Sequence, residues 1–124
     1  MFQNCTSLTA APVLPAKPLA NYCYQGMFKG CTSLSTPPVL PAKTLGRYCY
    51  HDMFGNCTSL TAAPTLPATR MAVNSYYFMF EGCTALSTPP ELPASSLEIA
   101  CYAGMFSGCT ALTSIPILSA NLQR

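Results

Sequence analysis

Charged residues are scarce in this chain of 124 residues, which has six Lys and Arg, four Asp and Glu, and a charged fraction of 8%. Soluble domains usually carry about 25%. The cations are scattered: Lys17, Lys29, Lys43, Arg47, Arg70 and Arg124. Without a basic cluster, nucleic acid and an anionic membrane surface are not expected partners. Half of the residues are apolar, so the chain is not expected to be a disordered linker despite its 12 prolines.

Long apolar runs and a leader segment are also lacking. A bilayer span needs roughly 18 consecutive apolar residues, whereas residues 71–80, MAVNSYYFMF, form a short run broken by Asn74 and Ser75. The N-terminus shows no basic segment followed by an apolar one, so no secretory signal is visible. Membrane insertion is not expected. Because the sequence stops inside a repeat, we expect a fragment or mature piece of a longer protein.

Groups that commonly carry catalysis or bind metals are few. With a single histidine, a Ser-His-Asp set is not plausible, and His51 and Asp52 form the only His–acid pair. There is no Cys-x-x-Cys pair for zinc and no glycine-rich phosphate loop. The four acids do not share repeat positions, which disfavours paired-carboxylate chemistry. The sequence therefore predicts a protein that is not an enzyme and that uses no metal or cofactor.

What the chain does contain is one motif repeated every 26 residues. It reads MFQNCTSLTAAPVLPA at residue 1, MFKGCTSLSTPPVLPA at 27, MFGNCTSLTAAPTLPA at 53, MFEGCTALSTPPELPA at 79 and MFSGCTALTSIPILSA at 105. The repeats are 1–26, 27–52, 53–78, 79–104 and an incomplete 105–124. One such unit cannot bury its own apolar face, so neighbouring units must stack. We predict a single repeat solenoid over residues 1–124.

The elements of each 26-residue coil follow from positions counted from its Met. Cys-Thr-Ser-Leu-Thr at positions 5–9 alternates and predicts a short strand, giving a parallel β-sheet on one face. The following Pro-x-Leu-Pro segment must be extended, with the Leu inward. Apolar residues four apart (Leu19, Cys23, Met27 and Cys31) predict a short helix or helical turn. Gly or Asn at position 4 predicts a left-handed residue that closes it.

A second period overlies the first. Odd repeats carry Asn-Cys and even repeats Gly-Cys through residue 94, which makes a larger unit of 52 residues, twice 26. This alternation indicates duplication history rather than mechanism.

The motif C-Y-x-x-M-F-x-G-C-T-S-L-T-x-A-P, and GCTALTSIPI at 108–117, resemble the bacterial BspA-type leucine-rich repeats. The resemblance covers essentially the whole chain. This chain departs from the BspA-type pattern in three ways: Met stands before Phe, the repeat is longer, and a Pro-x-Leu-Pro segment is inserted. The variant looks like arrays in large surface proteins of gut Bacteroidales. The resemblance implies a leucine-rich-repeat-like curved solenoid in an extracellular or cell-surface setting, and it implies adhesin-like binding rather than catalysis.

Eight cysteines occupy two repeat positions. Position 5 holds Cys5, Cys31, Cys57, Cys83 and Cys109, and position 23 holds Cys23, Cys49 and Cys101. They could form an extracellular disulfide framework or two columns of small buried thiols. Buried free thiols are favoured, because Ser75 replaces a fourth Cys at position 23 and a helical spacing of about 12 Å is too long to bridge.

Two functions compete. One is a binding module for a protein or glycan partner, and the other is a structural protein whose uncapped ends stack head to tail into filaments. The partner-contact candidates are Tyr22, Lys29, Lys43, Arg47, Tyr48, His51, Arg70 and Tyr77. The end-stacking candidates are Phe2, Ile115, Ile117 and Leu118. Ice binding through the hydroxyls of positions 7 and 9 is disfavoured, because Ala85 and Ala111 interrupt that row.

Overall fold

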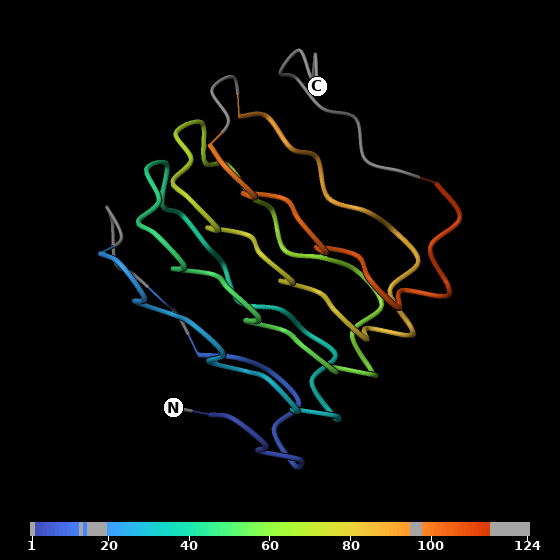
Figure 1. Ribbon diagram of the computed structural model, residues 1–124. Helices are drawn as coiled ribbons and strands as arrows, with labels where there is room; N and C mark the ends of the chain where they lie inside the picture. The colour runs from blue at the N-terminus through green and yellow to red at the C-terminus, as the bar shows by residue number, and fades with distance from the viewer. Residues whose placement is uncertain (1, 13, 15–19, 95–97, 115–124) are drawn as a thin grey trace.

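Successive repeats lie side by side in the computed structural model, which describes residues 2–12, 14, 20–94 and 98–114. Figure 1 shows the chain as a series of coils, one beyond the next, from the blue N-terminal end to the red C-terminal end. Within this described part the bridges between neighbouring coils are isolated and parallel, at Ala10–Thr36, Thr44–Arg70 and Ala62–Thr88. Each bridge joins residues 26 apart, so the sequence period is the register of the stack.

One side of each coil is a continuous run of turns, which we call a turn run. The turn runs cover residues 21–30, 47–56, 73–82 and 99–108. In the first three turn runs, every second N–H donates to the next coil, as from Phe28 to the Met53 carbonyl at 2.9 Å. The N–H groups between them close turns within the coil, as from Met27 to the Tyr24 carbonyl at 3.2 Å. The alternation satisfies the backbone donors inside the turn run.

Every fourth residue of a turn run has a positive φ. In the second run these residues are Tyr48 at 55°, Asp52 at 59° and Asn56 at 58°. The predicted left-handed residue at position 4 is confirmed by Asn4, Gly30, Asn56, Gly82 and Gly108. It does not close a helix, however, because this segment is a turn run and the described residues contain no helix.

The other side of each coil carries the proline segment. Its side chains alternate, with Pro38, Leu40 and Ala42 buried and Val39 exposed by 71%. The inward orientation predicted for the Leu between the prolines is confirmed. The strand predicted over positions 5–9 is instead a turn, as the bond from the Leu60 N–H to the Cys57 carbonyl shows. Among the described residues, the expected sheet is reduced to isolated bridges, and these lie outside positions 5–9.

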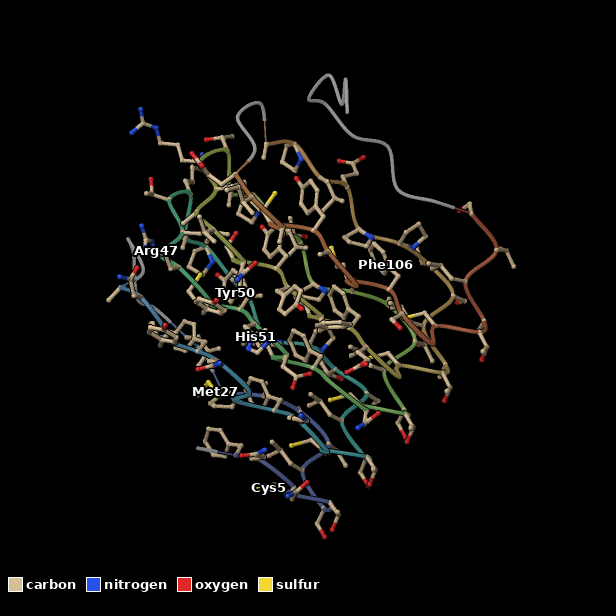
Figure 2. The ribbon with its side chains drawn as sticks, viewed as in Figure 1. Cys5, Met27, Arg47, Tyr50, His51 and Phe106 are labelled. Atoms are coloured by element: carbon tan, nitrogen blue, oxygen red, sulfur yellow. The ribbon has the colours of Figure 1, made fainter. Side chains whose placement is uncertain are left out.

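The constant positions of the repeat fill the core between these two sides. Phe28, Phe54 and Phe80 are fully buried, and the column of rings from Phe2 to Phe106 stacks with centroids 5.5 to 5.8 Å apart. A parallel column of tyrosines, which includes Tyr50 in Figure 2, has centroids 5.7 to 6.2 Å apart. Each coil therefore buries its aromatic rings against the equivalent rings of its neighbours.

The alternation of Asn and Gly at position 4 has a packing role that the sequence interpretation missed. The Asn4 side chain lies over Gly30, where an added Cβ would fall 2.1 Å from its Oδ1 atom. Asn56 covers Gly82 in the same way, at 2.2 Å. An Asn at this position therefore requires a Gly in the next repeat.

Candidate functional site

Four of the predicted contact residues meet on the outer surface of the turn runs. The rings of Tyr22 and Tyr48 stack at 5.1 Å, and those of His51 and Tyr77 stack at 5.2 Å. Tyr48 meets His51 edge to face at 5.5 Å, which joins the two stacks. We call Tyr22, Tyr48, His51 and Tyr77 the aromatic patch. It spans three repeats.

The turn geometry places these side chains outside. Tyr22 and Tyr48 occupy position 22, where φ is positive at 62° and 55°. His51 and Tyr77 occupy position 25, three residues further along the same surface. Tyr22 is 56% exposed, whereas Tyr50, at position 24, is 2% exposed. The 26-residue register then sets equivalent rings against one another.

His51 links the patch to the neighbouring repeat. The amide of Gln25 donates to Nδ1 of His51, with the two nitrogens 2.8 Å apart. Burial lowers the pKa of His51 from its ordinary value of 6.5, and this outweighs the opposing effect of Asp52. The imidazole is therefore neutral at pH 7, and it adds a hydrogen-bonding group rather than a charge to the patch.

Lys29, another predicted contact residue, is held in an ion pair. Its Nζ lies 2.5 Å from Oδ2 of Asp52. The hydrogen bond to Asp52 is the main reason why the pKa of Lys29 is raised. The other carboxylate oxygen, Oδ1, is buried and has no hydrogen-bond partner within the described structure. Lys29 thus neutralises the acid next to His51.

The remaining basic candidates divide between two places. The Arg47 side chain is exposed beside Tyr48, and the backbone N–H of Arg47 donates to Oδ1 of Asn21 at 2.8 Å. Arg47 and His51 are both labelled in Figure 2. Lys43 and Arg70 lie together at another corner, where the Arg70 N–H donates to the Lys43 carbonyl at 3.2 Å. No side-chain hydrogen bond, ion pair or ring contact in the described part of the chain joins Lys43 or Arg70 to the aromatic patch.

The end-stacking candidates are only partly placed. Phe2 is half-buried and stacks on Phe28 at 5.6 Å. Ile115, Ile117 and Leu118 lie outside the described residues.

The cysteines serve packing in this structure. All eight are free, and Cys31, Cys57 and Cys83 are buried as predicted for a thiol column. The Cys57 thiol donates to the Phe28 carbonyl at 3.1 Å, and burial raises its pKa to about 12. Cys23 departs from the prediction of buried columns, because it lies exposed in the first turn run.

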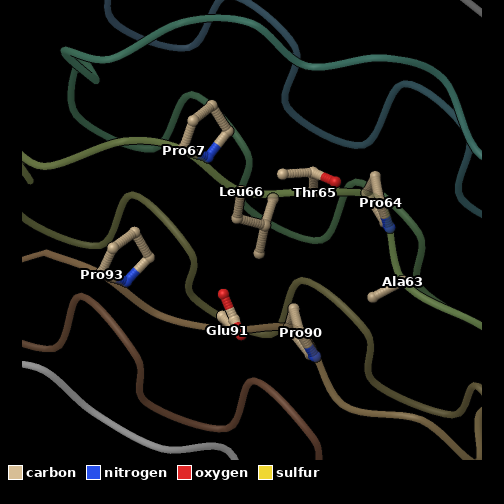
Figure 3. Close-up of a pocket in the computed structure, with 8 residues that line it drawn as sticks. All are labelled: Ala63, Pro64, Thr65, Leu66, Pro67, Pro90, Glu91 and Pro93. Atoms are coloured by element: carbon tan, nitrogen blue, oxygen red, sulfur yellow. The ribbon is translucent and has the colours of Figure 1, made fainter.

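A shallow groove between proline segments is a surface that sequence reasoning missed. Figure 3 shows Pro64 to Pro67 of one repeat beside Pro90 to Pro93 of the next. The groove has a volume of about 330 Å³, and a similar one lies between Pro37–Pro41 and Ala63–Pro67. The repeated Pro-x-Leu-Pro was the available signal, because prolines cannot hydrogen-bond neighbouring coils together.

Among the described residues, no cluster of three or more His, Cys, Asp or Glu could hold a metal ion. That part of the chain also has no helix long and apolar enough to cross a membrane. Comparisons with protein-family models, curated proteins and solved structures gave no match.

Proposed function

We propose that this chain is a non-enzymatic binding module of a cell-surface protein, in which the aromatic patch contacts a protein or glycan partner. The stacked coils are taken as a leucine-rich-repeat-like solenoid, and the extracellular setting follows from the BspA-type resemblance. The observation that carries the proposal is the meeting of Tyr22, Tyr48, His51 and Tyr77 on one surface.

The patch has the chemistry of a contact surface. Tyrosine rings offer a large apolar area together with a hydroxyl group, and they lose little side-chain entropy on binding. The rings here are already held by stacking across repeats, which further lowers the cost of ordering them. Tyr22 ends the row and is the most exposed ring, at 56%. Its outer face can stack on a sugar or on another aromatic side chain.

The electrostatics of the patch favour a neutral or weakly acidic partner. His51 is neutral at pH 7, and Asp52 is paired with Lys29. Arg47 stays exposed beside Tyr48 as a cation available to a partner. A guanidinium can bind a carboxylate in a bidentate fashion, which adds specificity at the rim of an apolar contact.

The test is binding of the labelled chain to a printed glycan array and to a panel of immobilised extracellular-matrix proteins. Tyr48→Ala removes the ring that joins both stacks, and it is expected to weaken binding about tenfold or more, as for a central contact residue. The matched control is the double variant Lys43→Ala/Arg70→Ala, which removes two exposed cations at the other corner. Equal losses in both variants, or no binding to any probe, would contradict the proposal.

A further inference from the structure

His51 is the only histidine in the sequence, and it lies between two repeats inside the aromatic patch. Its ring stacks on Tyr77 of the next repeat at 5.2 Å and meets Tyr48 of its own repeat at 5.5 Å. Its Nδ1 atom contacts the amide of Gln25, in the preceding repeat, at 2.8 Å. Coils on both sides of the ring therefore fix its position.

The contact with Gln25 suits both protonation states of the ring. The neutral ring accepts a hydrogen bond at Nδ1 from the Gln25 amide nitrogen. A protonated ring donates from Nδ1, and the same amide can then turn over and accept through its oxygen, because it carries both a donor and an acceptor. Tyr77 also tolerates the charge, since a cation is attracted to the face of a stacked aromatic ring. Protonation thus changes the charge of the patch and leaves its contacts in place.

The charged groups around His51 leave a protonated ring without an ion-pair partner. Burial is the largest effect on the pKa of His51 and lowers it. The carboxylates of Asp52 and Glu81 raise that pKa, and Lys29 lowers it further. Asp52 is already paired with Lys29 at 2.5 Å, and within the described residues no carboxylate pairs with the imidazole. A proton gained by His51 on the acid side of pH 6.5 therefore adds a positive charge that an external anion can neutralise.

The second ring nitrogen, Nε2, is the atom that can reach such an anion. Because Nδ1 accepts the bond from Gln25 in the neutral ring, Nε2 carries the proton. Nε2 donates to no group in the described part of the chain and is not among its buried unpaired atoms. In the charged ring, the Nε2–H becomes a stronger donor, and a carboxylate is its best acceptor.

The size of the patch favours a glycan over a protein as the partner. One ring-to-ring step is 5.1 Å, between Tyr22 and Tyr48, and the other is 5.2 Å, between His51 and Tyr77. A stable protein interface covers about 800 Å² on each partner, far more than so short a row of rings provides. A row of this length instead fits a short stretch of linked sugar rings.

Building on the binding function proposed for this patch, we propose that its partner is a glycan that carries a carboxylate, and that protonation of His51 strengthens this binding at acid pH. The Nε2–H of the charged imidazole donates to the carboxylate while the aromatic rings contact the sugar. At pH 7 the same N–H is a neutral donor, so the glycan is held less tightly. The patch then releases its partner as the pH rises.

A short labelled oligomer of galacturonic acid is the probe. Its carboxyl groups, like the α-carboxyl group of a peptide, stay largely ionised down to about pH 4.5. Its methyl ester has the same sugar rings without the charge and is the matched control. Fluorescence anisotropy measures binding of each probe to the whole chain from pH 7.5 to 4.5, in reductant. Proton NMR of the single imidazole measures the protonation of His51 over the same range.

Affinity for the acid is expected to rise about tenfold as His51 becomes charged, as for a hydrogen bond between charged groups. Because burial lowers the pKa of His51, the midpoint of this rise is expected below pH 6.5 and at the midpoint of the NMR titration. Affinity for the methyl ester is expected to stay constant.

Two variants assign the response to His51. His51→Gln removes the titrating ring and installs the residue that position 25 already holds in the first repeat, so the fold should accept it. Its affinity for the acid should no longer change with pH. Gln25→Glu sets a carboxylate against Nδ1 and favours the charged ring. Both midpoints should then move to higher pH by the same amount.

The inference would be overturned by a pH response that persists in His51→Gln or by an equal response of the methyl ester. Equally tight binding of an oligoglutamate peptide at acid pH would also overturn it, because the partner would not be a glycan. Binding that ignores pH but is lost in Tyr48→Ala would overturn this inference and leave the patch as a contact surface. Absence of binding to every probe would overturn both proposals.

Discussion

At the scale of single residues, the carbonyl at position 2 explains the constant cysteine three residues later. The Phe28 carbonyl accepts the N–H of Cys31 at 3.0 Å and the thiol of Cys57, from the next repeat, at 3.1 Å. The same thiol bond recurs from Cys83 to Phe54 and from Cys109 to Phe80. A small apolar side chain with a weak donor suits this buried place.

Glycine at position 26 gives a test that separates backbone strain from packing. Gly104 and Gly26 have nearly equal φ values of 63° and 61°. An added Cβ at Gly104 would lie 2.3 Å from the Phe78 ring, whereas at Gly26 it would meet nothing within 4 Å. Gly26→Ala should cost about 1–2 kcal/mol of unfolding free energy for its left-handed backbone. Gly104→Ala should cost about 1–3 kcal/mol more from overpacking.

Urea unfolding of both variants beside the wild type measures the two costs. Equal losses would show that the Phe78 ring moves aside without cost, and they would remove the packing argument.

The hydroxyl of Tyr76 gives a second residue-scale prediction. It is buried and has no hydrogen-bond partner within the described structure. Tyr76→Phe removes an unsatisfied buried group and keeps the ring in its column, so we expect stability to rise by about 1 kcal/mol. Thermal unfolding of this variant, with the exposed change Tyr22→Phe as a control, tests the expectation. A loss of stability in Tyr76→Phe alone would mean that the hydroxyl is bonded.

At the scale of elements, the turn run shows why the sequence predicted a helix. Apolar residues recur every four positions, as Cys23, Met27 and Cys31 do, and this spacing suits a helical stripe. A chain of turns with a left-handed residue at every fourth position produces the same spacing. The distinguishing signal was present, because nine of the 13 residues with positive φ are Gly, Asn or Asp, which tolerate that conformation. That signal was obscured because four of the left-handed positions hold other residues, namely Tyr22, Tyr48, Phe78 and Ala100.

The 26-residue register between neighbouring coils was predictable from the sequence, whereas the side-chain contacts between coils were predictable only in part. The column of like side chains predicted for the Cys at position 5 is confirmed, and the Phe at position 2 and the Tyr at position 24 form columns of the same kind. Tyr22, Tyr48, His51 and Tyr77 were predicted as partner contacts, but their meeting depends on positions 22 and 25 sharing one face of the turn run. In the predicted helix, positions 22 and 25 would have had a different arrangement relative to the basic candidates Lys43, Arg47 and Arg70. The proline groove lies between neighbouring coils, and the repeated Pro-x-Leu-Pro segment was the signal available for it in the sequence.

The columns of thiols and phenols predict a stability that falls at alkaline pH. Burial raises the pKa of Cys49 and of Cys57 from 9.0 to about 12, and that of Tyr102 from 10.0 to about 12. Between pH 9 and 12 the unfolded chain loses these protons while the folded chain keeps them. The unfolded state then binds fewer protons, so stability is complete below about pH 9 and is lost as the pH rises.

Urea unfolding at several pH values from 7 to 11, in reductant, measures this loss. Cys57→Ser removes one buried thiol and should flatten the decline above pH 9. A free energy of unfolding that stays constant up to pH 11 would mean that these groups are not protected from ionisation.

At the scale of the whole molecule, the Asn–Gly pairing predicts which repeat can be removed. Deleting residues 27–52 brings Asn56 next to Asn4, where the new Cβ would meet the Asn4 side chain. Deleting residues 53–78 brings Gly82 next to Gly30, as Gly108 lies next to Gly82 with its nearest backbone contacts at 3.4 Å. Both products have the same length. We expect the first to be less stable by about 1–3 kcal/mol, the usual cost of overpacking.

Thermal unfolding of the two deletion products makes the comparison, and Asn4→Gly in the first product supplies a rescue. Stability that returns with this change assigns the loss to the Asn pair. A first product that is as stable as the second would show that the Asn side chain swings away freely.

The pairing also bears on how such an array changes length over generations. Unequal recombination between neighbouring copies can add or remove one repeat or two. Events that leave two Asn copies adjacent carry a penalty at the new junction, whereas exchanges of a full 52-residue pair restore the original order. Selection would therefore retain exchanges in pairs more often. The alternation of Asn and Gly at position 4 is then a consequence of which duplications are compatible with packing in the stack.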